Sequence, residues 1–187
     1  MDLLEIGKGI LTSCMNVKAG ENVLVITDDE KLPIGDALYR AAKGLGADTM
    51  LVTMTPREVS GQEPPPAIAA AMKAADVVLC PMSTSITHTK AKIEAAKAGA
   101  RIATMPNITE DMFCQGAMTA DYDTVLALTD RVTQLLTQAS TARIEKEGHV
   151  LTLDLRGRSG VPSSGVYRER GQAGNLPSGE AYIAPLE

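Results

Sequence analysis

The clearest pattern along the chain is an alternation of short, continuously apolar runs with longer segments whose apolar residues recur every three or four positions. Continuous runs rich in β-branched residues are typical of strands that are buried on both faces. We predict such strands at residues 23–27, 49–54, 77–80 and 100–105. The three-to-four spacing indicates amphipathic helices, which we predict at residues 3–17, 33–45, 66–75, 87–98, 110–113 and 122–139.

Strands that alternate with helices pair in parallel through right-handed crossovers. The predicted fold class is therefore α/β, with a doubly wound, mainly parallel sheet and helices on both faces. This Rossmann-like domain is expected to span residues 1–141.

The pattern changes after the last long helix. Residues 143–146 and 150–154 alternate polar and apolar side chains around Glu147-Gly-His149, which predicts an antiparallel hairpin. From Arg156 the chain is rich in Gly, Ser and Pro, and a final strand is expected to begin at Tyr182. Residues 142–187 are thus either an appended flap or the incomplete start of a second domain.

Composition narrows the class of protein. The chain has 44% hydrophobic and 22% charged residues, no apolar run long enough for a bilayer, and a net charge of -5. This charge and the absence of a basic cluster argue against nucleic-acid and membrane partners. The N-terminus lacks signal-peptide features, so we expect a soluble, cytoplasmic protein. Cys14, Cys80 and Cys114 are widely spaced among apolar neighbours and are expected to be reduced core thiols.

The turn after the first predicted strand argues against a nucleotide site, because it has no glycine and the chain has no Gly-Lys-Ser/Thr triplet. Asp28 and Asp29 occupy this turn. They either cap the next helix or hold a cation, and helix capping is the preferred interpretation.

The turn after the third strand, residues 82–90, is rich in hydroxyl groups and contains His88. A Ser85–His88 hydrolase pair is disfavoured, because the two side chains point in different directions at a helix start and no third partner is evident. We expect Ser85 or Thr87 to cap the helix. Ser85 and His88 are nevertheless candidates for a ligand pocket, since ligands bind open sheets at this edge.

Polar groups also gather in the C-terminal loop. Arg156, Arg158, Arg168 and Arg170 are either solvated or bind an anionic group, and Arg158 is a candidate pocket residue. His149, beside Gly148, is expected to be solvated.

The segment from Asn175 to Glu180 ends on a carboxylate that follows Pro-Ser-Gly and enters a strand. A strand can hold such a side chain rigidly while the turn leaves its oxygens open, which suits a metal ligand. Spacing alone does not favour this interpretation, so Glu180 is a candidate metal ligand only on chemical grounds, and Asn175 and Ser178 are candidate pocket residues. No catalytic residue is assigned.

The string NLPSGEAYIAP, from Asn175 to Pro185, resembles the first metal-ligand motif of the aminopeptidase T-like metallopeptidases. Residues 85–90, 99–106 and 155–158 occur in a similar order in that family. The resemblance implies that Glu180 binds one of two divalent ions (zinc, cobalt, manganese or magnesium), that N-terminal residues are hydrolysed from peptides, and that the protein is a homodimer.

One departure from the family pattern matters. The family's other ligands, a glutamate, histidines and an aspartate, lie in a C-terminal half without a counterpart in this chain. A single carboxylate cannot assemble a site that needs three or more protein ligands. We therefore expect this chain to be the N-terminal portion of a metallo-aminopeptidase, with residues 142–187 as the start of its metal-site domain. Alone, the chain is expected neither to bind metal nor to be active.

Two alternatives remain. Relatives on the same scaffold open dihydroxypyridine rings with one iron and dioxygen; in that case the substrate is a small molecule and Glu180 is a pocket residue. Alternatively, the chain is a complete, non-enzymatic binding module that uses residues 83–88. The length of the encoding reading frame discriminates the enzyme hypotheses from this last one.

Overall fold

The computed structural model describes residues 2–186, which form two compact units. The sheet unit comprises Met1–Ala120 and Gly165–Pro177. The hairpin unit comprises Asp121–Ser164 and Ser178–Glu187.

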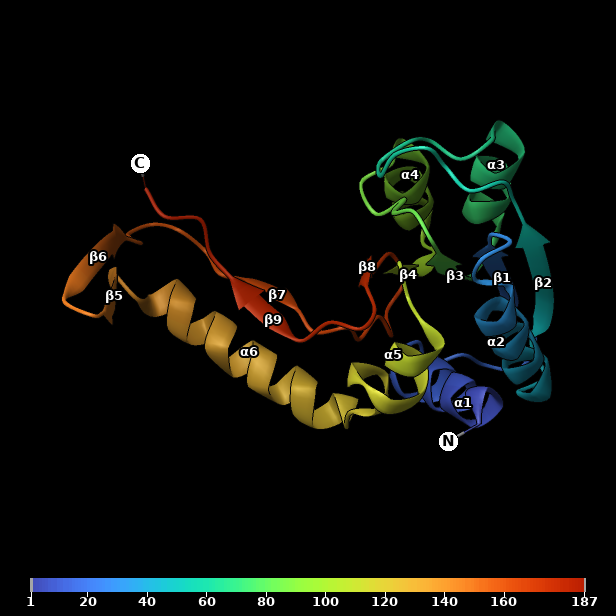
Figure 1. The fold of residues 1–187 in the computed structure, drawn as a ribbon, viewed down its shortest axis with the longest axis horizontal. Coiled ribbons are helices and arrows are strands. Elements are labelled where there is room, and N and C mark those ends of the chain that lie inside the picture. The colour runs from blue at the N-terminus through green and yellow to red at the C-terminus, as the bar shows by residue number, and fades with distance from the viewer. Residues whose placement is uncertain (1, 187) are drawn as a thin grey trace. The chain divides into compact units, whose positions relative to one another are not determined.

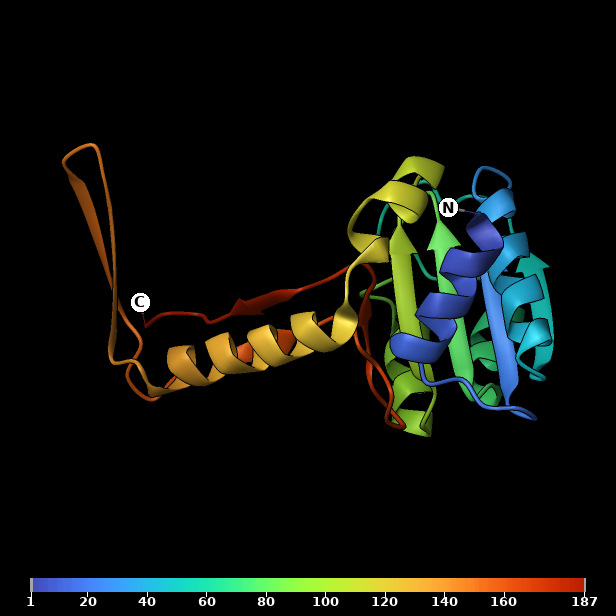
Figure 2. The same cartoon turned by 90° about the horizontal axis from the view of Figure 1, so that it is seen from below.

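The sheet unit contains five parallel strands in the order β2-β1-β3-β4-β8. The second and third strands in this order, β1 and β3, are not consecutive in the sequence, so the chain reverses its winding between them. Figure 2 shows the strands side by side and running in the same direction. The strands are β1 (Asn22–Thr27), β2 (Asp48–Thr53), β3 (Val77–Met82), β4 (Arg101–Pro106) and β8 (Ala173–Asn175).

Helices cover both faces of this sheet. In Figure 1, α3 and α4 lie on one face, and α1 and α2 lie on the other. This arrangement confirms the predicted doubly wound α/β fold. The helices of the unit are α1 (Leu3–Ser13), α2 (Leu32–Gly44), α3 (Pro66–Ala74), α4 (Lys90–Ala98) and α5 (Glu110–Gln115), with a short 3-10 turn at Ala117–Thr119.

Burial explains why the apolar runs form central strands. Residues 23–26 and 77–80 are almost completely buried, as expected for strands that pack helices on both faces. Cys80 belongs to this core, and burial raises the pKa of its thiol to about 12, although nearby Lys92 opposes the rise. All three cysteines are free, as predicted; Cys14 and Cys80 are buried and Cys114 is half-buried.

The start of α4 differs from the prediction. The helix begins at Lys90 rather than at residue 87, and its N-cap is Thr89, whose side chain accepts a hydrogen bond from the Lys92 N–H. Neither Ser85 nor Thr87 caps it. The helix ends at Ala98, and its C-cap is Gly99, which adopts φ 108° in the left-handed region that favours glycine.

The strand β8 was not predicted, because the Gly-rich loop after Arg156 was expected to have no core of its own. Residues 165–177 return to the sheet, where the Ile102 N–H donates to the Gln172 carbonyl (3.0 Å) and the Leu176 N–H donates to the Thr104 carbonyl (2.9 Å). Tyr167 and Leu176 are buried there. A three-residue strand has too few positions to show an apolar period.

The hairpin unit contains one long helix and two small antiparallel sheets. The strands β5 and β6 form the predicted hairpin, with positive φ at Glu147 (51°) and Gly148 (81°), as in a two-residue primed turn. His149 is the first residue of β6 rather than part of the turn. The elements are α6 (Tyr122–Gln138), β5 (Thr141–Lys146), β6 (His149–Asp154), β7 (Val161–Ser163) and β9 (Glu180–Tyr182).

The two units do not follow the predicted boundary at 141/142. The helix α6 groups with the hairpin, and residues 165–177 group with the sheet. Within residues 2–186, none of the helices has the length and apolar character needed to cross a bilayer.

Candidate functional site

The carboxyl ends of β1 and β3 mark the position where open α/β sheets bind ligands, because the winding reverses between these strands. In this protein Asp28 occupies that position and is completely buried. Its carboxylate accepts hydrogen bonds from the Ser83 N–H and hydroxyl (both 2.7 Å) and from the Lys31 N–H (3.2 Å). Asp28 therefore links the two strand ends to each other.

This geometry decides between the two interpretations of Asp28 and Asp29. The oxygens of Asp28 accept protein donors, so the cation interpretation has no support there. The capping interpretation needs correction as well, since the N-cap of α2 is Lys31 and it has no side-chain cap. Asp29 is exposed.

A second polar cluster lies at the same edge of the sheet and joins β3, β4 and β8. The Oδ1 atom of Asn175 lies 2.9 Å from the Thr87 hydroxyl and 2.8 Å from the Thr104 hydroxyl. The two hydroxyls lie 2.9 Å apart, and Ser85 donates to Thr87 at 3.0 Å. We call Ser85, Thr87, Thr104 and Asn175 the edge cluster.

The number of hydroxyl protons limits how many hydrogen bonds the edge cluster can donate. Each hydroxyl carries one proton, so Thr87 donates either to Asn175 or to Thr104. Thr87 and Thr104 are 8% and 1% exposed. Among residues 2–186 the Nδ2 amide of Asn175 makes no hydrogen bond, and this side chain is exposed. The cluster therefore fixes the carbonyl side of Asn175 and leaves its N–H donors available.

The edge cluster brings together two of the predicted pocket residues, Ser85 and Asn175, through Thr87. His88 does not join it: its side chain is exposed and lies before α4. The sequence disfavours a hydrolase pair of Ser85 and His88, and in the structure the side chain of Ser85 contacts Thr87.

The other predicted site residues lie in the hairpin unit. Ser178 donates to the carbonyl of Ser163 (2.7 Å), and the two hydroxyls lie 2.8 Å apart. Glu180 pairs directly with Ser163 across β7 and β9 and is exposed. Within residues 2–186, no three His, Cys, Asp or Glu side chains form a group that could hold a metal ion. The role of Glu180 as a metal ligand stays a prediction.

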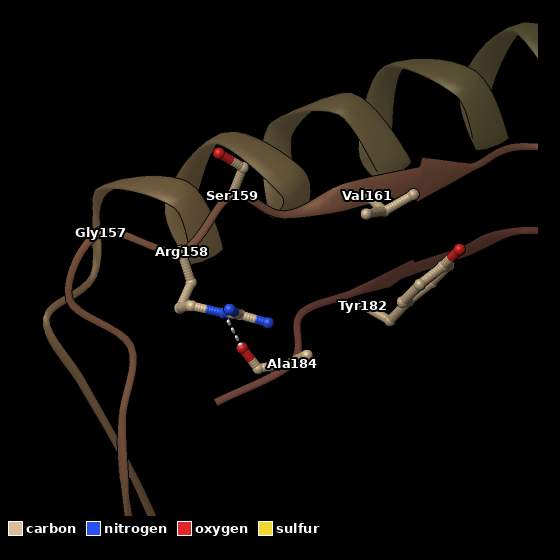
Figure 3. A pocket seen from close by; sticks show the side chains of 6 residues that line it. All are labelled: Gly157, Arg158, Ser159, Val161, Tyr182 and Ala184. Atoms are coloured by element: carbon tan, nitrogen blue, oxygen red, sulfur yellow. Dashed lines mark hydrogen bonds between the residues drawn. The ribbon is translucent and has the colours of Figure 1, made fainter. Parts of the chain in front are cut away.

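A shallow pocket of about 230 Å³ also lies in the hairpin unit (Figure 3). Its lining consists of one cation, one aromatic ring, and small or apolar residues. They are Gly157, Arg158, Ser159, Val161, Tyr182 and Ala184. Arg158, a predicted pocket residue, is one of these lining residues, and its role in ligand binding stays a prediction.

The four arginines of the C-terminal loop have separate partners, which argues against one shared anion. Arg156 pairs with Asp154, and Arg158 donates to the Ala184 carbonyl at 2.7 Å. Arg168 donates to the Ser13 carbonyl, and the guanidinium of Arg170 lies 3.9 Å from Asp76. The Arg156 contact holds the pKa of Asp154 at about 2.

Sequence reasoning missed several residues of these sites. Thr104 was overlooked although it is a polar residue inside a buried strand, a signal that could have been used. Tyr167, whose hydroxyl donates to the Asn175 carbonyl at 2.6 Å, gave no signal, because the loop around it shows no apolar period. The Asp28–Ser83 contact joins residues 55 positions apart, which no local pattern reveals.

Comparison with known proteins gives one family match. The family model of NicX, 2,5-dihydroxypyridine 5,6-dioxygenase, matches residues 2–187. A search of curated protein sequences finds no significant match.

Two solved structures share the fold. A 2,5-dihydroxypyridine dioxygenase from Pseudomonas putida KT2440 superposes with a TM-score of 0.77 at 21% identity, over 99% of this chain and 56% of that one. AmpT from Thermus thermophilus gives a TM-score of 0.67 at 14% identity, over 98% of this chain and 61% of that one. The chain therefore spans less than two thirds of either structure.

These matches change the preferred interpretation. The likeness to AmpT is structural only, whereas the family model covers nearly the whole chain and describes the dioxygenase alternative. The preference for a metallo-aminopeptidase, which rested on the motif from Asn175 to Glu180, is not what the family match favours. The chain belongs to the NicX family of 2,5-dihydroxypyridine 5,6-dioxygenases.

Proposed function

We propose that this chain forms part of an iron-dependent dioxygenase that opens the ring of a dihydroxypyridine. The observation that carries the proposal is the family match over residues 2–187. The shared fold with the Pseudomonas putida dioxygenase supports it.

The proposed reaction consumes one dioxygen for each ring. The bond between C5 and C6 breaks, and each of these carbons gains one oxygen atom from O₂. C5, which already carries a hydroxyl group, becomes a carboxylic acid, and C6 becomes an N-formyl group. All atoms of both reactants are kept in the product, so no additional reductant is required.

Iron would supply the activation of dioxygen in such an enzyme. Non-haem iron oxygenases commonly hold the metal with two histidines and one carboxylate. The described residues contain no group of three suitable side chains, so they do not fit an iron site by themselves. Because the chain spans 56% of the dioxygenase structure, a protein of that length would have further residues available as ligands.

The contribution that we propose for this chain is binding and orientation of the substrate. In the hairpin unit, Glu180 is an exposed carboxylate two residues before Tyr182, which lines the pocket of about 230 Å³. Its oxygens could accept a hydrogen bond from a ring hydroxyl.

The test is turnover by the full gene product. The purified protein, loaded with Fe(II) in air-saturated buffer, is expected to consume 2,5-dihydroxypyridine and O₂ in a 1:1 ratio. Dioxygen uptake and ¹⁸O incorporation into both product carbons measure this. Removal of iron with a chelator is expected to abolish turnover, and added Fe(II) to restore it.

The same preparation discriminates the aminopeptidase hypothesis. Release of leucine from a leucyl substrate with zinc or cobalt, together with no oxygen uptake on 2,5-dihydroxypyridine, would overturn the proposal.

A further inference from the structure

The pocket in the hairpin unit lies on a defined face of the β7–β9 ribbon. In the antiparallel register Val161 pairs with Tyr182, and Ser163 pairs with Glu180. Directly paired residues project to the same face, as do residues two apart along a strand. Val161, Tyr182, Ser163 and Glu180 therefore share one face. The pocket lined by Val161 and Tyr182 is next to Glu180.

Arg158 gives this pocket an unusual charge. Its Nε donates to the Ala184 carbonyl at 2.7 Å, which fixes the guanidinium at the pocket (Figure 3). No carboxylate of residues 2–186 pairs with it, and its two terminal nitrogens have no hydrogen-bond acceptor among these residues. A guanidinium has five N–H donors, so four remain available.

The neighbouring Arg156, in the same loop, is an arginine whose guanidinium is paired with a carboxylate. Its Nε lies 3.0 Å from Asp154 Oδ1, and its Nη2 lies 2.5 Å from Asp154 Oδ2. In this bidentate pair the carboxylate of Asp154 neutralises the charge of Arg156. The hydrogen-bond partner of Arg158, two residues later, is a backbone carbonyl and not a carboxylate, so the charge of Arg158 is not neutralised within the described residues.

The remaining lining restricts the shape of a ligand. The Tyr182 side chain is 51% exposed and Val161 is 41% exposed, so both offer apolar surface to the pocket. A volume of about 230 Å³ is below the range of about 300–1,000 Å³ that is typical for drug-sized ligands. A single ring fits these limits better than a nucleotide or a peptide.

We propose that this pocket binds a planar aromatic ring that carries an anionic oxygen, with the Arg158 guanidinium on the anion and the ring against Tyr182 and Val161. Guanidinium groups bind carboxylates and similar anions with two parallel hydrogen bonds. Tyrosine adds stacking on the ring. The identification of this ring with the dihydroxypyridine substrate rests on the proposed function; the binding chemistry does not.

The test is a titration of the 187-residue chain with three probes, followed by NMR of the backbone amides. Benzoate combines ring and anion, phenol offers the ring, and acetate offers the anion. We expect benzoate to bind at least tenfold more tightly than either of the others, with shifts at Gly157, Ser159 and Tyr182. Equal affinity for benzoate and acetate, or shifts elsewhere in the chain, would overturn the proposal.

Matched variants test which of the two arginines binds the anion. Arg158→Gln is expected to weaken benzoate binding at least tenfold. Arg158→Lys is expected to weaken it several-fold, because lysine keeps the positive charge but lacks the two parallel N–H donors of the guanidinium. Arg156→Gln is expected to leave the affinity unchanged. Equal losses in the Arg156 and Arg158 variants would show a general charge effect and refute the site. If Arg158→Gln does not fold, the Arg158→Lys result decides.

Failure of this inference differs from failure of the proposed function. Benzoate binding that depends on Arg158, without turnover of 2,5-dihydroxypyridine by the full gene product, keeps the pocket and refutes the dioxygenase. Turnover with an unchanged KM in Arg158→Gln refutes the pocket as the substrate site and keeps the dioxygenase.

Discussion

Polar side chains at the carboxyl edge of the sheet and at the β7–β9 ribbon differ in burial and in hydrogen-bonding within the protein. At the sheet edge, Asp28 and Thr104 are 0% and 1% exposed, and protein donors or acceptors surround them. Glu180 on this ribbon and Arg158 in the loop before β7 are exposed, and the charge of Arg158 has no carboxylate partner among the described residues.

This difference separates structural polar groups from candidate binding groups. A buried polar group must be hydrogen-bonded within the protein, because leaving it unsatisfied costs about 1–3 kcal/mol. Its capacity is then not available to a ligand. The position where the fold class usually binds ligands is therefore largely filled by Asp28 and Ser83, whereas the ribbon keeps spare donors and acceptors.

The largest expected effect is at Asp28. Asp28→Ala removes the buried acceptor of three hydrogen bonds and leaves the half-buried Ser83 N–H without a partner. We expect a loss of about 3 kcal/mol in the free energy of unfolding. Urea denaturation followed by circular dichroism measures it, since the sequence contains no tryptophan.

The exposed neighbour provides the control for this variant. Asp29→Ala is expected to change the free energy of unfolding by less than about 0.5 kcal/mol. Equal losses at Asp28 and Asp29 would show that burial of Asp28 does not determine its role.

A smaller loss is expected for Thr104→Val, which keeps the shape of the side chain but removes one hydroxyl from the edge cluster. The Oδ1 atom of Asn175 then keeps only Thr87 as a donor. We expect about 1–2 kcal/mol of destabilisation in urea. Thr53→Val, at an exposed position of β2, is the matched control and should be nearly neutral. No difference between the two variants would mean that the cluster does not stabilise the sheet edge.

The smallest effect is expected at Asp154, whose partner Arg156 is exposed. The side-chain hydrogen bonds from Arg156 lower the pKa of Asp154 to about 2 from an ordinary value of about 3.9. Because the pKa is lowered in the folded state, this contribution to stability is present above about pH 3.9 and is lost as the pH falls toward 2.

An NMR titration of the Asp154 carboxyl carbon measures this shift. In Arg156→Gln the pKa is expected to return toward its ordinary value. A lowered pKa that persists in Arg156→Gln would refute the pairing with Arg156.

The elements of the sheet were largely predictable, because each rests on a local pattern. The run Val23–Ile26 is buried on both faces, and the stripe from Leu3 to Cys14 faces the core, as their periods indicate. The start of α4 was misplaced by three residues, since Ser85, Thr87 and Thr89 are all suitable caps by sequence. Only the backbone geometry selects Thr89.

The candidate sites were predictable in part. Asn175, Ser85 and Arg158 were proposed from residue type and position; the structure gives the contacts of each, and their roles in binding stay predictions. Their partners Thr87, Thr104 and Ala184 were not identified as such, because each lies in another element. The comparison with known families also changed the preferred chemistry, which the single motif from Asn175 to Glu180 did not discriminate.

The sequence by itself determined the fold class, the strands and helices of the sheet unit, and the hairpin with its turn at Glu147 and Gly148. These features follow from periodicity and turn chemistry, which act over a few residues. The tertiary structure alone decided that residues 165–177 add a fifth strand, that Asp28 meets Ser83, and that Arg158 differs from Arg156. Each of these depends on which distant groups meet, and hence on hydrogen-bond partners that no local pattern specifies.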